Sequence, residues 1–97
     1  MMNHKKTYLD KVEARMEQIM YRLGQVEDHV VESGDTKDTM KVIELKVQAR
    51  MVEDKLVEIE HTPAQAIRRL QTTAELMMDK LVEHLNRVET GLKQESA

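Results

Sequence analysis

The chain has 97 residues, of which 40% are hydrophobic and 34% are charged, a composition typical of helical bundles and unlike that of disordered chains. This length suits a single modest core, so we expect one helical domain over residues 1–97. Lys and Arg number 15 against 18 Asp and Glu, and because both signs are interleaved without a basic stripe, we expect no nucleic-acid partner.

The first segment carries apolar residues at alternating spacings of three and four, the pattern of a coiled-coil seam. The seam consists of Leu9, Val12, Met16, Ile19, Leu23, Val26 and Val30. A lone helix with this seam would leave aliphatic side chains in water, each worth about 1.5–3 kcal/mol on full burial. We therefore predict a helix over residues 5–33 that packs against a partner helix.

A polar run over residues 32–38 interrupts the seam. Gly34 tolerates left-handed backbone geometry, and the Asp35 and Thr36 side chains can cap a following helix. The apolar frame of the next segment is also out of step with the first. We predict that the chain breaks near Gly34 and that a second helix follows over residues 36–61.

The second helix carries two apolar lines. The first consists of Val42, Leu45, Ala49, Val52, Leu56 and Ile59. The second consists of Met40, Ile43, Val47 and Met51. We expect the second line to widen the buried face of this helix, which would then contact two neighbours.

Thr62 and Pro63 predict the start of a third helix, because Pro suits the first helical position and Thr62 with Gln65 can form a capping box. We place this helix at residues 63–93. Its seam contains one step of four in place of three, which relaxes left-handed supercoiling. The seam consists of Ile67, Leu70, Ala74, Met78, Leu81, Leu85, Val88 and Leu92. The predicted fold is therefore all-α, with three amphipathic helices in an antiparallel, coiled-coil-like bundle.

Three short motifs resemble those of a family of small bacterial coiled-coil proteins of unknown function, sometimes labelled apolipoprotein-like or stress-related. The motifs are Tyr8-x-x-Lys11-x-Glu13-Ala14, Ile43-Glu44-Leu45 and Lys55-Leu56-x-Glu58-Ile59. The resemblance implies no catalytic residues. Family members tend to continue as helix through the position of Gly34. The resemblance therefore implies an alternative fold, in which residues 5–60 form one long helix and helix 63–93 folds back on it. They also tend to carry Trp at the position of Ile19 and near Ile67, where this chain has none.

Residues suited to catalysis or cofactor binding are scarce. There is no Cys, Trp or Phe, whereas ligand pockets usually have aromatic walls, so we expect no cofactor and no enzymatic activity. Glu58 and His61 have the Glu-x-x-His spacing of di-iron bundles, but such a site needs a second copy of the motif, which the chain lacks. We therefore expect solvated histidines and no metal site.

We expect a cytoplasmic structural or protein-interaction module that acts through helix packing, with itself or another helical protein as its partner. The expected core and interaction residues are Leu9, Val12, Met16, Ile19, Leu23, Val26, Leu45, Val52, Leu56, Ile59, Leu70, Leu81, Leu85 and Val88. One alternative is an amphipathic lipid-surface binder, which the missing aromatic anchors and the net negative charge of −3 disfavour. Another is a small adaptor or regulator that docks on another protein.

Overall fold

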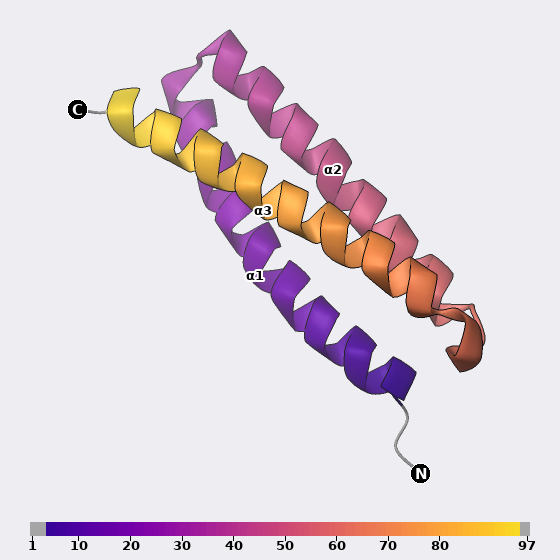
Figure 1. Ribbon diagram of the computed structural model, residues 1–97. Coiled ribbons are helices and arrows are strands. Elements are labelled where there is room, and N and C mark those ends of the chain that lie inside the picture. The colour runs from indigo at the N-terminus through magenta and orange to yellow at the C-terminus, as the bar shows by residue number, and fades with distance from the viewer. Residues whose placement is uncertain (1–3, 96–97) are drawn as a thin grey trace.

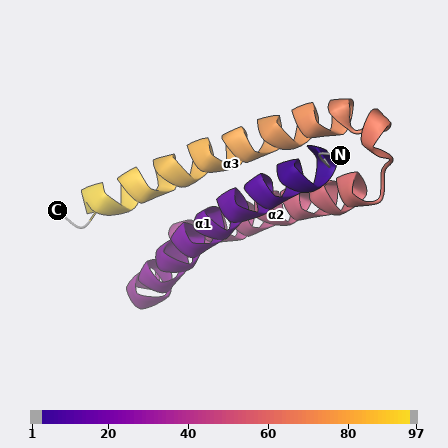
Figure 2. The same ribbon diagram turned by 90° about the horizontal axis from the view of Figure 1, so that it is seen from below.

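The computed structural model describes residues 4–95 and contains three long helices, α1 (His4–Ser33), α2 (Thr36–Glu60) and α3 (Arg68–Glu95). Successive helices reverse direction, and α3 lies across the hairpin formed by α1 and α2 (Figures 1 and 2). The molecule is a rod measuring 53 × 19 × 17 Å. The prediction of an all-α fold built from three packed helices is confirmed.

The turn between α1 and α2 forms where the sequence predicts it. Gly34 has a φ of 69°, in the left-handed region, and its N–H donates to the Val30 carbonyl oxygen at 2.9 Å. The Asp35 side chain caps α2, accepting from the backbone N–H of Lys37 at 2.8 Å and of Asp38 at 3.3 Å. The alternative of one uninterrupted helix over residues 5–60 is therefore wrong.

We predict that replacing each of two glycines in this hairpin with alanine changes the free energy of unfolding in opposite directions. Gly34→Ala should lower the free energy of unfolding by about 1–2 kcal/mol, because a Cβ is unfavourable in left-handed backbone. Gly24→Ala should raise it by about 0.5–1 kcal/mol, because Gly24 lies inside α1 and an added Cβ meets no atom within 4 Å. Urea denaturation of the two variants measures both effects, and equal shifts would contradict this account of the turn.

The connection between α2 and α3 differs from the predicted capping box. The Thr62 hydroxyl donates back to the Glu58 carbonyl oxygen at 2.6 Å, so it does not cap the next helix. After Pro63 the chain forms a short 3₁₀ helix, η1 (Ala64–Ala66), and α3 begins at Arg68, five residues later than expected. The prediction failed because Thr62 has a nearer acceptor in the open carbonyls at the end of α2.

The first turn of α1 holds this connection in place. The Lys5 ammonium donates to the carbonyl oxygens of Glu60 at 2.9 Å and Thr62 at 3.0 Å. Carbonyls at a helix C-terminus carry partial negative charge and lack partners within the helix, so a cation there is favourable. The N-terminal end of α1 is thus fixed to the far end of α2.

The buried side chains form one continuous cluster between the helices. It consists of Val12, Met16, Ile19, Leu23, Val26, Val30, Val42, Leu45, Ala49, Val52, Leu56, Ile59, Ile67, Ala74, Met78, Leu81, Leu85, Val88 and Leu92. Leu9 and Leu70, both expected in the core, are only partly buried and pack against its edge. Both lie near the end of the rod where α1 and α3 begin, so fewer neighbours cover them.

Polar side chains join α1 to α3, which run in the same direction (Figure 1). On α1 they lie seven residues apart, at Tyr8, Arg15 and Arg22, so they share one side of the helix. Their acceptors on α3 are, in order, the Gln71 carbonyl oxygen at 3.2 Å, Asp79 at 2.9 Å and Glu89 at 3.3 Å. Burial raises the pKa of the Tyr8 hydroxyl, and the nearby Glu75 carboxylate raises it further.

Candidate functional site

The second apolar line of α2 does not lie in the core. The exposed fractions of Met40, Ile43, Val47 and Met51 are 54%, 48%, 55% and 55%. At 3.6 residues per turn these positions lie about half a turn around α2 from the core line that includes Leu45. The prediction that they widen the buried face is wrong, because α1 and α3 both pack on the opposite side. We call these four residues the outer stripe.

Polar contacts flank α2 on both sides and separate the outer stripe from the core. Towards α1, the Lys46 ammonium lies 2.6 Å from the Glu27 carboxylate. Towards α3, the Gln48 amide oxygen lies 2.5 Å from Nδ1 of His84. The exposed outer stripe lies beyond these contacts, on the side of α2 opposite its core line.

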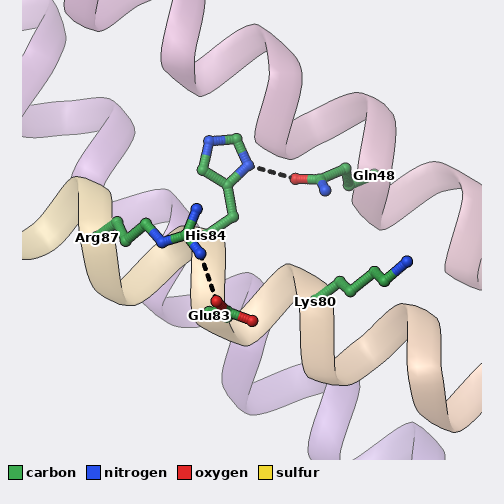
Figure 3. A pocket seen from close by; sticks show the side chains of 5 residues that line it. All are labelled: Gln48, Lys80, Glu83, His84 and Arg87. Carbon is green, nitrogen blue, oxygen red and sulfur yellow. Dashed lines mark hydrogen bonds and ion pairs between the residues drawn. The ribbon is translucent and has the colours of Figure 1, made fainter.

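A shallow pocket of about 340 Å³ lies between α2 and α3 beside this stripe, and we call it the polar groove. Its lining residues are Gln48, Lys80, Glu83, His84 and Arg87 (Figure 3). The His84 ring projects from α3 towards Gln48, while Arg87 pairs with Glu83 on the same helix. Four of the five lining side chains therefore form two pairs, His84 with Gln48 across the two helices and Arg87 with Glu83 along α3.

The polar groove continues into the outer stripe. A second pocket of about 230 Å³, lined by Gln48, Met51, Met77 and Lys80, joins the two. This face of the molecule therefore has apolar side chains on one side and charged or amide side chains on the other. Flexible Met side chains at the junction can adapt to the shape of a partner.

Most of the expected interaction residues lie inside the molecule. Of the fourteen, all except Leu9 and Leu70 are buried in the core, where the three helices satisfy one another's seams. These side chains hold the bundle together and are not available to a partner of the folded chain. The exposed apolar side chains include those of the outer stripe, which the sequence shows as a second line but does not assign to the surface.

The histidines and acidic residues are dispersed. Nδ1 of the exposed His61 lies 2.9 Å from the Val57 carbonyl oxygen, and the Glu58 carboxylate pairs with Lys55 at 2.8 Å. Across residues 4–95, no three His, Cys, Asp or Glu side chains gather as metal ligands would. Within the same range, no helix is long and apolar enough to cross a bilayer.

Comparisons of this chain with protein-family models, with curated proteins and with solved structures found no match. The resemblance to small bacterial coiled-coil proteins therefore stays a prediction.

Proposed function

We propose that the chain is a non-enzymatic, cytoplasmic interaction module that binds a helical protein through the outer stripe. The observation that carries the proposal is the line of half-exposed apolar side chains on the side of α2 opposite the core. Because the core residues of α2 pack against α1 and α3, the helix holds this line in a fixed arrangement. The polar groove supplies hydrogen-bonding groups along one edge of it.

The size of the stripe suggests a moderate affinity. Full burial of a Met, Ile or Val side chain is worth about 1.5–3 kcal/mol, so the remaining exposed half of each is worth roughly 1 kcal/mol. Four such side chains are too few for a permanent complex once the cost of association is subtracted. The outer stripe therefore suits a reversible partner whose own apolar face and rim charges complement it.

A lipid surface is the less favoured ligand. Interfacial helices use aromatic anchors and cationic flanks. The outer stripe contains no aromatic residue, and its border is of mixed charge, because the acidic residues Glu44 and Glu58 alternate with Lys37 and Lys55. A helical protein can pair with these acids through basic residues, which a neutral or anionic bilayer does not offer.

Site-specific photocrosslinking in the source cells tests the proposal. A photoreactive residue at Val47, the middle of the outer stripe, should form a covalent adduct with another polypeptide. The matched control is the same residue at Leu76, which is 57% exposed on α3 outside the stripe and the polar groove. Adducts at position 47 that are no more abundant than at position 76 would contradict binding through the outer stripe.

A further inference from the structure

We infer that a second copy of this chain binds the outer stripe, with the two α2 helices side by side and antiparallel. The inference rests on the proposed function, because it names the partner of the same surface. In residues 4–95, no element lies over this side of α2, so a second copy can approach without meeting α1 or α3 (Figures 1 and 2).

Exposed apolar side chains are spread on both sides of the middle of α2. Met40 and Val57 are the outermost, with exposed fractions of 54% and 52%, and Val47 lies near the midpoint. When Met40 faces Val57 of an antiparallel copy, the same contact recurs at the other end of the pair by two-fold symmetry. In this register Val47 faces Arg50, so each apolar N-terminal half covers the more polar C-terminal half of its partner.

Arg50 and Asp54, two charged residues in the C-terminal half of α2, already form an ion pair with each other. The Arg50 guanidinium lies 3.5 Å from the Asp54 carboxylate on the same helix, at the outer surface. This pair continues the line of Met40, Ile43 and Val47 at spacings of three and four, so it lies within the contact, where the aliphatic stem of Arg50 covers Val47 of the second copy. Asp54 faces Ile43 of the second copy in this register, which lowers the affinity of the dimer. Asp54 nevertheless keeps its ion pair with Arg50 of its own helix.

Charges beside the outer stripe select the antiparallel orientation. On the flank nearer to α3, the chain places Lys37, Glu44, Lys55 and Glu58, which alternate in sign along the helix. An antiparallel pair brings this flank against its own reversed copy. Lys37 then meets Glu58, which also pairs with Lys55 of its own helix at 2.8 Å, and Glu44 meets Lys55, each within about 3 Å along the axis at 1.5 Å rise per residue. A parallel pair instead brings Glu58 beside Glu53 of the second copy, which is repulsive.

The reversed order makes the flank complementary to itself, which a surface for an unrelated partner does not need. Lys37 takes part in none of the ion pairs formed among residues 4–94, so its charge is available to the second copy. This complementarity identifies a second copy of the chain as the partner.

Light scattering on chromatographically separated protein, over a concentration series, measures the pairing. The mass should rise from 11.3 kDa towards twice that value as concentration increases. Val47→Lys, which sets a cation against Arg50 of the second copy near the two-fold axis, should raise the dissociation constant by at least about a hundredfold. The matched control Leu76→Lys should leave it unchanged, and circular dichroism should show both variants to be folded. A wild-type chain that stays monomeric at every concentration overturns the inference.

Disulfide trapping tests the orientation, since the chain contains no natural cysteine. Met40→Cys and Val57→Cys should each fail to form a covalent dimer alone and should form one when mixed under mild oxidation. Covalent dimers from Met40→Cys alone would show a parallel pair and overturn the antiparallel arrangement.

The solution mass and the crosslinking at Val47 together distinguish a failure of self-pairing from a failure of the proposed function. A monomeric chain whose photoreactive residue at Val47 still captures a different polypeptide would overturn self-pairing and leave the interaction function standing. A monomeric chain that captures nothing at that position would overturn both.

Discussion

Ile19→Asp should unfold the bundle. Ile19 is 3% exposed in the middle of α1, so the substitution removes a packed side chain and places a carboxylate among apolar neighbours. The combined cost is about 4 kcal/mol or more, which approaches the whole stability of a small domain, about 5–15 kcal/mol. Far-ultraviolet circular dichroism should show loss of most helical signal at room temperature.

The control for this prediction lies two residues away on the same helix. Tyr21 is 70% exposed, so Tyr21→Asp introduces the same charge without burying it and should leave the helical signal intact. A folded Ile19→Asp variant would contradict the position of α1 in the core. Unfolding of both variants would instead indicate that added negative charge, and not burial, destabilises the chain.

Leu81→Ala should lower the free energy of unfolding by about 2–5 kcal/mol, because Leu81 is fully buried in α3 and its truncation leaves a cavity. Leu76→Ala removes the same atoms from a side chain that is 57% exposed and should change stability by less than about 0.5 kcal/mol. Thermal and urea denaturation followed by circular dichroism measure the difference. Similar losses in the two variants would show that α3 is rotated relative to the arrangement described above.

The helices were predictable because local signals agree with the packing. The end of α1 at Ser33 and the start of α2 at Thr36 follow from a glycine and a capping acid, which act within a few residues. The regular spacing of Leu23, Leu45 and Leu85 likewise places them in the core, where each is at most 2% exposed.

Periodicity alone could not predict which side of α2 is buried and which is exposed. Its core line and the outer stripe are both apolar and both regular, so spacing alone cannot show which of them the other helices cover. The choice depends on where α1 and α3 lie, which long-range contacts such as that between Lys46 and Glu27 report. The candidate site was therefore visible in the sequence as a pattern, but its exposure was not.

The hydrogen bonds and ion pairs between α1 and α3 could not be predicted from the sequence either. Tyr8, Arg15 and Arg22 lie seven residues apart, which is a readable signal, but charged residues at this spacing usually face solvent. Their partners lie 63 to 67 residues away, and only the relative rotation of the two helices brings them together.

The contact of Lys5 with the end of α2 has a consequence for biosynthesis. Lys5 is synthesised before its acceptor carbonyls, which belong to Glu60 and Thr62 and are added 55 and 57 residues later. The α1–α2 hairpin can therefore form early. The contact of Lys5 that holds the open end of the hairpin together forms only after the connection between α2 and α3 has emerged. The apolar faces that α3 covers stay exposed until α3 has emerged as well, and the nascent chain is most vulnerable to aggregation and proteolysis in this interval.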